Sequence, residues 1–215
     1  MIPSSVTRIG YSAFYHCKSI AQVIIPSSVT SIGSSTFNEC ISLAQITIPS
    51  SVSLIDQSVF EKCYSLVEIR IPSSVTSISK CSFRYCTSLI QVTIPSSVTS
   101  IGDEAFHQCT SLKQITIPSS VTSIGRRAFK ECYSLVEITI PSSLSIIKES
   151  TFSNCISLKQ VTIPSSVESI EEEAFEHCCM LSKITIPSSV RPKGRYIFYD
   201  CPLIQDMLPS SFRQK

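Results

Sequence analysis

The chain has 215 residues, of which 43% are hydrophobic and 16% are charged, and its formal net charge at pH 7 is +2. A charge balance this weak lacks the basic footprint of a nucleic-acid-binding protein. No apolar run is longer than four residues, whereas a helix that spans a bilayer takes about 20. We therefore expect no nucleic-acid partner and no insertion into a membrane.

Glycines are too few and too far apart for several catalytic motifs. The chain has five, and the nearest two, such as Gly10 and Gly33, are 23 residues apart. A dinucleotide-binding G-x-G-x-x-G turn, a phosphate-binding P-loop and a G-x-S-x-G nucleophile elbow all need closer glycines. Counting alone excludes these three kinds of enzyme site.

An internal repeat of 23 residues runs through the whole chain. One unit, Ile94 to Thr116, reads I-P-S-S-V-T-S-I-G-x-x-A-F-x-x-C-x-S-L-x-Q-I-T. Nine prolines, nine phenylalanines and nine cysteines recur at this interval of 23 residues. The cysteines are Cys17, Cys40, Cys63, Cys86, Cys109, Cys132, Cys155, Cys178 and Cys201. A period between 20 and 50 residues predicts an array of stacked units, each stable only against its neighbours.

At the N-terminus the first unit begins in the middle, without the Leu-x-x-Ile half of its strand. An uncapped end with an unpaired strand edge invites association. We expect the protein to form homo-oligomers, or to be part of a longer chain. The residues expected to take part in self-association are Val6, Ile9, Phe14, Met207, Leu208 and Phe212.

Within each unit the sequence predicts a strand, a tight corner and a return. In the segment from Leu112 to Ile117, Ile115 and Ile117 alternate with polar residues, which is the pattern of a strand with one buried face. Pro118 then ends the strand because it lacks a backbone donor. From Ile101 to Leu112 the apolar residues are spaced by three and four, which predicts a short helical or 3₁₀ return.

The segment Leu-x-x-Ile-x-Ile-Pro-x-x-Val resembles the strand of a leucine-rich repeat. The 23-residue unit with A-F-x-x-C resembles the BspA-like subfamily of leucine-rich repeat proteins, over residues 2 to about 208. This resemblance implies an α/β repeat solenoid, right-handed, with about nine coils, a parallel sheet on one face and short helical or 3₁₀ returns on the other. In one respect the chain departs from the pattern, because serines such as Ser51, Ser97 and Ser120 stand where the corner usually has asparagine. A ladder of hydroxyl groups would have to replace the ladder of amides.

The last unit is degenerate. Pro192 interrupts it, and Lys193 takes the position that Ile101 fills elsewhere. Atypical terminal units act as caps in repeat proteins. We therefore divide the chain into a leucine-rich repeat solenoid over residues 1–190 and a degenerate capping repeat over residues 191–215.

The cysteines at the repeat positions are expected to be buried thiols. Equivalent residues of stacked coils lie about 4.8 Å apart with parallel side chains, which fits poorly with the geometry of a disulfide. Cys81 and Cys179 stand outside the repeat and are the thiols expected to be exposed. Because no cysteine pair has the spacing of a zinc site, no metal site is predicted.

The three histidines, His16, His107 and His177, fall in different units and are expected to be solvated surface residues. Coils about 4.8 Å apart separate them too far for a shared metal or a catalytic dyad. With no catalytic residues and no cofactor motif in the sequence, we predict that the protein is not an enzyme and has no cofactor.

Charge lies mainly on the returns. Arg126, Arg127 and Lys130 form a basic step. An acidic step follows two units later, at Glu168, Glu171, Glu172, Glu173 and Glu176. Such charges either form a solvated outer face or provide complementary contacts between molecules.

The outward side chains of the predicted strands form a second surface, which we call the strand face. Its residues are Gln45, Thr47, Glu68, Arg70, Gln91, Thr93, Gln114, Thr116, Glu137, Thr139, Gln160 and Thr162. Solenoids bind protein partners on such extended surfaces, although ladders of Thr and Gln could also satisfy one another. Arg70 with Glu68 is the least repetitive place on this face. The neighbours Val67, Ile90 and Val136 are expected to be exposed.

These observations predict a non-enzymatic protein-interaction module with a protein partner. The BspA-like resemblance implies adhesion at a cell surface, with binding to host matrix proteins and aggregation of cells. The alternative is an intracellular regulatory scaffold, similar to the leucine-rich repeat regulators of protein phosphatases. The unpaired cysteines, the lack of a recognisable signal peptide and the lack of N-x-[ST] sites favour this alternative.

A cytoplasmic location is therefore favoured for this chain, and the cell surface follows if it is exported unconventionally or is a fragment. A third interpretation is a threonine face that binds ice or glycans. That interpretation needs a more regular array than Arg70 allows.

Overall fold

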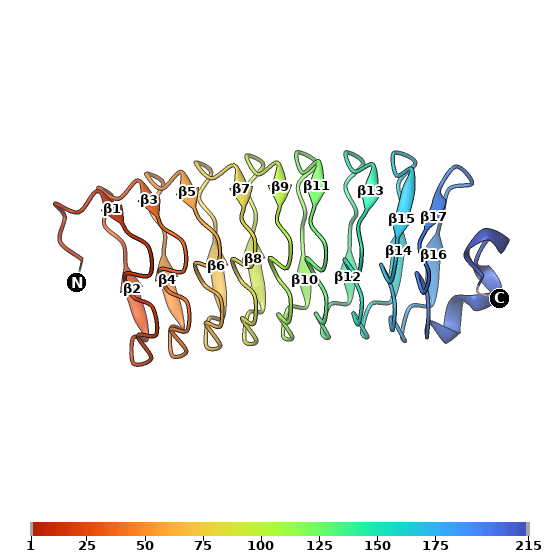
Figure 1. The fold of residues 1–215 in the computed structure, drawn as a ribbon, viewed down its shortest axis with the longest axis horizontal. Helices are drawn as coiled ribbons and strands as arrows, with labels where there is room; N and C mark the ends of the chain where they lie inside the picture. The colour runs from red at the N-terminus through yellow and green to blue at the C-terminus, as the bar shows by residue number, and fades with distance from the viewer. Residues whose placement is uncertain (1, 214–215) are drawn as a thin grey trace.

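The computed structural model describes residues 2–213, which wind into one solenoid with its two ends far apart (Figure 1). Short strands of adjoining coils pair in parallel. The register places residues 23 apart side by side, as in Gln22 with Gln45 and Ser77 with Ser100. The 23-residue repeat of the sequence is therefore one turn of the solenoid.

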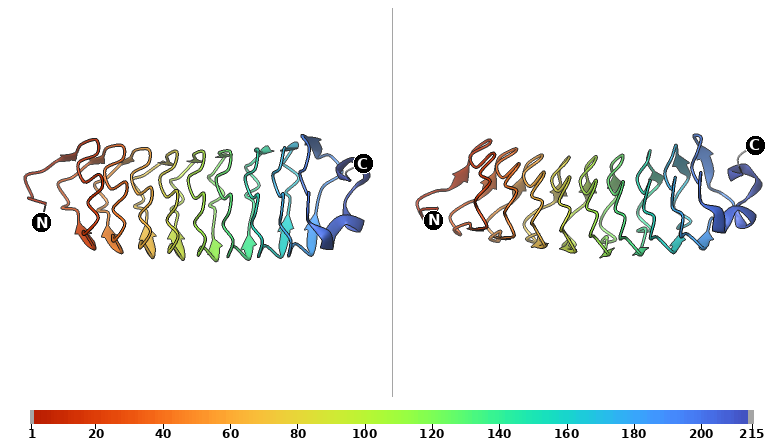
Figure 2. Two further views of the ribbon diagram at one scale, coloured as in Figure 1. Left: turned by 60° about the horizontal axis from the view of Figure 1, so that its bottom comes forward. Right: turned by 90° about the horizontal axis from the view of Figure 1, so that it is seen from below.

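The strands form two rows along the solenoid (Figures 1 and 2). The odd-numbered row consists of β1 (Arg8–Ile9), β3 (Ser31–Ile32), β5 (Leu54–Ile55), β7 (Ser77–Ile78), β9 (Ser100–Ile101), β11 (Ser123–Ile124), β13 (Ile146–Ile147), β15 (Ser169–Glu171) and β17 (Arg191–Lys193). The even-numbered row consists of β2 (Gln22–Ile24), β4 (Gln45–Thr47), β6 (Glu68–Arg70), β8 (Gln91–Thr93), β10 (Gln114–Ile115), β12 (Glu137–Ile138), β14 (Gln160–Thr162) and β16 (Lys183–Thr185). Hydrogen bonding along the even-numbered row is interrupted, because β2–β4, β6–β8 and β10–β12–β14–β16 are separate ladders.

A Pro-Ser-Ser corner separates the two strands of a coil. The amide of Val121 donates to the carbonyl of Pro118 at 3.0 Å, which closes the turn. In six corners the second serine also bonds to the preceding coil. Ser51 Oγ donates to the carbonyl of Val29 at 2.6 Å, and Ser97 makes the equivalent bond at 2.7 Å. The predicted hydroxyl ladder is therefore confirmed, with backbone carbonyls as its acceptors.

The returns, which lead from each odd-numbered strand to the next even-numbered strand, are built from turns. Phe106 donates its amide hydrogen to a carbonyl of the next coil, whereas His107 donates three residues back within its own coil. Two non-glycine residues of every return have positive φ, such as Glu104 at 55° and Gln108 at 57°. A left-handed residue interrupts a right-handed helix, so the helical returns predicted from the spacing of three and four do not form.

The core is a stack of equivalent side chains, one set from each coil. Phenylalanines from Phe14 to Phe198 stack ring on ring, with centroids 5.2–5.7 Å apart. Beside them the repeat cysteines from Cys40 to Cys201 donate from Sγ to a phenylalanine carbonyl of the preceding coil, as in Cys109 to Phe83 at 3.2 Å. Each coil fills its interior only because the coils on both sides complete it.

The solenoid has about eight complete turns rather than the nine predicted. The odd-numbered row has nine strands, but the even-numbered row has eight, since the first unit lacks the sequence of its even-numbered strand. In the last unit a 3₁₀ helix follows the final cysteine in place of a strand. The register also slips by one residue there, so that Pro192, and not Lys193, lies opposite Ile170.

Two 3₁₀ helices close the C-terminal end, η1 (Pro202–Met207) and η2 (Ser210–Phe212). Leu208 and Phe212 are buried, and the ring of Phe212 meets that of Phe198 edge-on at 5.8 Å. These two residues cover the end of the core, in contrast to the expectation that they form a contact surface. Met207 is 60% exposed and does reach the surface.

At the N-terminal end, the described residues leave the core open. Val6 and Phe14 are half-buried there, and Ile9 is buried. Together with their neighbours they line an open hollow of about 540 Å³. Phe14 is the first ring of the stack and packs on Phe37. Among the described residues it lacks the second stacked neighbour that the inner rings have.

Candidate functional site

The strand face is the exposed side of the even-numbered row (Figure 2). Because side chains alternate along a strand, β6 buries Ile69 and exposes Glu68 and Arg70 on either side of it. The same alternation in the other coils brings all twelve predicted residues of the strand face to one surface, and all twelve are exposed.

The side chains of the strand face make very few hydrogen bonds to one another. Over the described residues, the one bond between members of this face joins Gln160 Nε2 to Glu137 Oε1, at 3.5 Å. The other amides and hydroxyls face solvent. The interpretation that these ladders serve only to satisfy one another therefore has no support in the geometry.

A hollow of about 870 Å³ opens on the strand face across β2, β4, β6 and β8. Among the described residues that line it, Arg70 and Glu68 are the only charged ones. The polar side chains of its lining are Gln22, Gln45, Thr47, Ser50, Ser73, Gln91 and Thr93. The hollow includes both sides of the interruption between β4 and β6. The least repetitive place in the sequence of the strand face is thus also the place where this face is hollowed.

Two exposed apolar residues, Val67 and Ile90, directly precede Glu68 and Gln91 of the lining. Val67 and Ile90 are 42% and 44% exposed, as predicted. Val136 is half-buried instead of exposed, and its backbone is hydrogen-bonded to Lys113 and Lys159 of the adjoining coils.

Two residues near the hollow were not predicted. Ile24 is 62% exposed and takes the position that Thr47 has in the next coil. Gln22, on the same strand, lines the hollow. The alternation of the strand pattern would have identified both residues had it been extended to the first coil.

The return side, formed by the outer residues of the returns, differs from the strand face because its charges pair. Lys62 Nζ lies 2.7 Å from one oxygen of Glu39, and His16 Nδ1 lies 2.7 Å from the other. Arg84 Nη1 lies 2.7 Å from Glu104 Oε2. These contacts join adjoining coils, so the charges of the return side stabilise the stack itself.

The predicted basic step is engaged in the same way. Arg127 Nη2 lies 2.9 Å from Glu149 Oε1, and Arg126 Nη1 lies 3.8 Å from the other oxygen of the same carboxylate. In the acidic step, Glu173 accepts a hydrogen bond from a serine hydroxyl of the preceding coil at 2.9 Å. Several charged side chains of the two steps are therefore paired within the chain. Fewer of them are left for complementary contacts between molecules.

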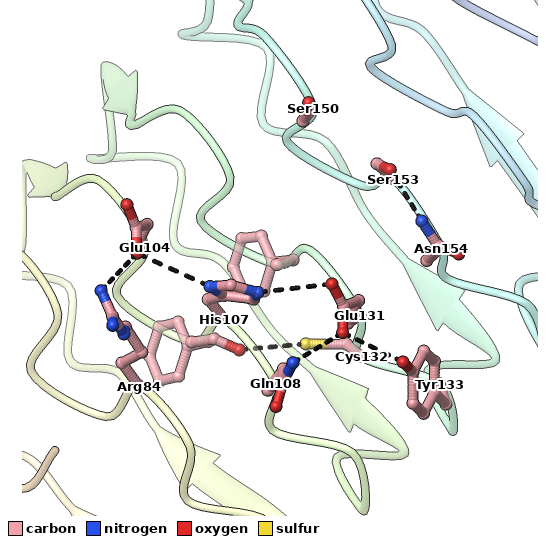
Figure 3. A network of polar contacts seen from close by, with 12 residues as sticks. Arg84, Glu104, His107, Gln108, Glu131, Cys132, Tyr133, Ser150, Ser153 and Asn154 are labelled. Atoms are coloured by element: carbon pink, nitrogen blue, oxygen red, sulfur yellow. Dashed lines mark hydrogen bonds and ion pairs between the residues drawn. The ribbon is translucent and has the colours of Figure 1, made fainter. Parts of the chain in front are cut away.

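His107 is the most enclosed of the three histidines. Figure 3 shows its side chain between Glu104 and Glu131. Its side chain is 13% exposed, and its two ring nitrogens lie 3.6 Å from Glu104 and 3.5 Å from Glu131. The ring of Tyr85 covers it from the preceding coil, with centroids 5.6 Å apart. His107 is therefore a half-buried residue between two carboxylates, and not the solvated residue predicted.

Hydrogen bonds on the return side lower the pKa of two carboxyl groups. The bond from Lys62 holds the pKa of Glu39 below its ordinary value. Burial raises the pKa of Glu131, but hydrogen bonds from Tyr133 and Gln108 outweigh it and leave that pKa lowered. Both groups are ionised at neutral pH.

All eleven cysteines are free. Burial raises the pKa of Cys40 to about 11 and that of Cys155 to about 12. Cys81, which was expected to be exposed, is buried, because Arg84 lies against it with Nη1 3.8 Å from Sγ. Cys179 is half-buried.

Over residues 2–213, no three side chains of His, Cys, Asp or Glu are grouped as metal ligands. In the same part of the chain, no helix combines the length and the apolar character needed to cross a membrane. The site that the geometry offers is an open surface with hydrogen-bonding groups, one cation and a hollow.

Comparison with known proteins agrees with the fold. The chain matches the BspA type leucine-rich repeat region, in six copies over residues 1–113 and 76–205. A leucine-rich repeat protein from Bacteroides ovatus is 33% identical and superposes with a TM-score of 0.82, and the match covers 89% of this chain and 52% of that one. The leucine-rich repeat protein of T. pallidum is 29% identical with a TM-score of 0.55, over 82% of this chain and 72% of that one.

A leucine-rich repeat protein from Eubacterium ventriosum has the same fold, with 24% identity and a TM-score of 0.66 over 98% of this chain and 78% of that one. No curated protein matches the chain. The chain spans about half the length of the Bacteroides ovatus protein. Because the family match covers most of the chain and agrees with its repeat and its fold, the chain belongs to the BspA type leucine-rich repeat family.

Proposed function

We propose that the chain is a non-enzymatic protein-interaction module that binds its partner on the strand face. The observation that carries this proposal is the hollow around Arg70, on a face whose polar side chains have almost no hydrogen-bond partners among residues 2–213. Groups of this kind are free to exchange hydrogen bonds with water for hydrogen bonds with another protein. The extended surface of a solenoid supports the same assignment.

The test is a comparison of two triple variants. In the first, Thr47, Thr93 and Thr116 are each replaced by arginine, which places long charged side chains along the strand face. In the matched control, the exposed corner residues Ser96, Ser119 and Ser142 are each replaced by arginine. Both variants gain the same charge.

Binding of the two variants is measured on immobilised extracellular-matrix proteins and in pull-downs from cell extracts. We expect the strand-face variant to lose at least about 10-fold in affinity, since a misplaced charge in an interface costs several kcal/mol, and the corner variant to bind like the parent. Equal binding by all three proteins would show that the strand face is not the binding surface.

For the partner, we propose an adhesion-type role at a cell surface, in which the strand face binds a matrix protein or a protein of a neighbouring cell. A second candidate is an intracellular scaffold for a regulatory enzyme. The observation that favours the scaffold is that all eleven cysteines are free, since cysteines of proteins in oxidising compartments usually form disulfides.

Surface labelling of intact cells, compared with permeabilised cells, separates these two roles. Labelling of intact cells is expected for the adhesion-type role. Labelling that needs permeabilisation would reject adhesion and favour the scaffold.

We also propose that the protein associates with itself through the apolar hollow at the N-terminal end of the described residues. Val6, Phe14 and their neighbours line an open apolar hollow there, and one edge of β1 and of β2 is unpaired. Sedimentation equilibrium is expected to give a mass above that of the monomer, and Val6→Glu is expected to lower it. A parent protein that stays monomeric at high concentration would reject this proposal.

A further inference from the structure

Arg70 is an exception in its column of the strand face. The equivalent positions of the adjoining coils are Thr47 and Thr93, whose short side chains cannot extend over a guanidinium group. Arg70 is exposed on β6 and lines the hollow. It is therefore a long cation between two short neighbours, in a column that holds threonine at all its other positions from Thr47 to Thr185.

Arg70 also has no anionic partner over the residues that the structure describes. In that part of the chain the arginines in ion pairs are Arg84, Arg126 and Arg127. Glu68 lies two residues before Arg70 on the same face, yet the two side chains do not form an ion pair. The guanidinium of Arg70 therefore lies on a strand and is available to an anion from another molecule. Its planar fork of N–H donors is well suited to bind such an anion.

We infer that the hollow binds an extended peptide segment of the partner protein, and that Arg70 binds an acidic side chain of that segment. This inference rests on the proposed function and adds the chemistry of the ligand to it. The amides and hydroxyls around Arg70 supply hydrogen bonds for a peptide backbone. Val67 and Ile90, which are exposed and directly precede Glu68 and Gln91 of the lining, supply apolar contact for a neighbouring side chain.

The charges in the hollow favour a carboxylate over a phosphate or a sulfated glycan. Arg70 is its only cation among the described residues, and Glu68 is its only anion. Residues two apart on a strand lie about 7 Å from each other, so Glu68 repels a dianion or a dense row of sulfates. A single carboxylate can bind Arg70 while a backbone N–H of the same segment donates to Glu68.

The experiment selects binders from a phage-displayed library of random peptides on the intact protein and then measures affinities of synthetic peptides. We expect the selected peptides to be enriched in Asp and Glu. Arg70→Gln is expected to weaken the best peptide by about 10-fold or more, because a charge-assisted hydrogen bond is lost. Replacing the acidic residue of the peptide by its amide should cost a similar factor on the parent protein and little on Arg70→Gln.

Two matched variants serve as controls. Arg126→Gln removes an exposed arginine of the return side and should leave the affinity unchanged. Adding Thr139→Arg to Arg70→Gln recreates the Glu-x-Arg pattern at Glu137 and the residue that follows β12, away from the hollow. It should not restore binding, since the hollow is needed as well as the charge.

Several outcomes would overturn the inference. These are a library that yields no binder, binders without acidic residues, equal binding by Arg70→Gln, recovery by Thr139→Arg, or binding of heparin that depends on Arg70 and excludes peptides. If any of them occurs while the arginine triple variant of the strand face still loses the partner, only the ligand chemistry is wrong. If the triple variant keeps its partner, the proposed function itself fails.

Discussion

The return side and the strand face are made by the same repeating unit, yet their side chains behave differently. On the return side, residues of adjoining coils differ, as in His16, Glu39 and Lys62, and they pair with one another. On the strand face the equivalent residues are mostly identical, as in Thr93 and Thr116, and identical side chains offer each other no opposite charge. Side chains of one column can therefore form ion pairs with each other only where the residues of that column vary.

The difference predicts where mutations affect stability and where they affect binding. Changes under or on the return side remove contacts between coils and should lower the free energy of unfolding. Changes on the strand face remove little inside the protein and should leave stability unchanged. The following predictions test this division, from the largest expected effect to the smallest.

The repeat thiols should be almost unreactive in the native protein. Burial raises the pKa of Cys155 to about 12, which lowers its thiolate population on the order of a thousandfold relative to a free thiol. Titration with a thiol reagent at pH 8 should first modify the half-buried Cys17 and Cys179. The other nine should react only on denaturation, and rapid reaction of most cysteines would show that the return side is open.

Phe106→Ala should be strongly destabilising. The ring is fully buried and stacks on rings of both adjoining coils, so its removal leaves a cavity and costs about 3–5 kcal/mol. Thr116→Ala, in the same coil but on the strand face, should change stability by less than about 0.5 kcal/mol. Urea unfolding followed by circular dichroism measures both, and similar values for the two variants would contradict the division.

The two serines of one corner should differ in how much they contribute to the free energy of unfolding. Ser97 Oγ donates to the carbonyl of Val75 at 2.7 Å, so Ser97→Ala should cost about 1–3 kcal/mol as an acceptor loses its partner. Its neighbour Ser96 is exposed, and Ser96→Ala should stay within about 0.5 kcal/mol of the parent. Equal effects in the same unfolding assay would mean that the hydroxyl ladder does not stabilise the stack.

The smallest expected effect is a loss of stability at acidic pH. The hydrogen bond from Lys62 lowers the pKa of Glu39, so this carboxylate contributes stability above its unfolded pKa of about 4.3, and that contribution is lost as the pH falls through the lower folded value. The melting temperature should therefore decrease below about pH 4.5, and less so in Glu39→Gln. An identical pH profile for the two proteins would leave Glu39 without a role.

Much of the fold could be predicted from the sequence, because a 23-residue period leaves few ways to place equivalent residues except by stacking them. The strand at Gln114 and the corner at Pro118 follow from alternation and from the missing proline donor. The return was not predicted, since an apolar spacing of three and four fits a helix and also fits a turn with two left-handed residues, such as Glu104 and Gln108.

The candidate site was predicted in part. Alternation places Arg70 and its neighbours on one face, and the break in the repeat marks Arg70 as unusual. The hollow depends on how β4 and β6 meet in space, which no sequence pattern records. Cys81 was misplaced for a related reason: its burial depends on Arg84, which lies against it in the folded return.

The fixed offset between contacting residues has a consequence for how such a chain can change length. Almost every contact between coils joins residues separated by about one repeat, such as Cys109 with the carbonyl of Phe83 and Ser97 with that of Val75. If one repeat is duplicated or deleted in the gene, each remaining coil still meets a neighbour of the same kind. Proteins of this design can therefore become longer or shorter one coil at a time, while their two ends and a singular position such as Arg70 are inherited unchanged.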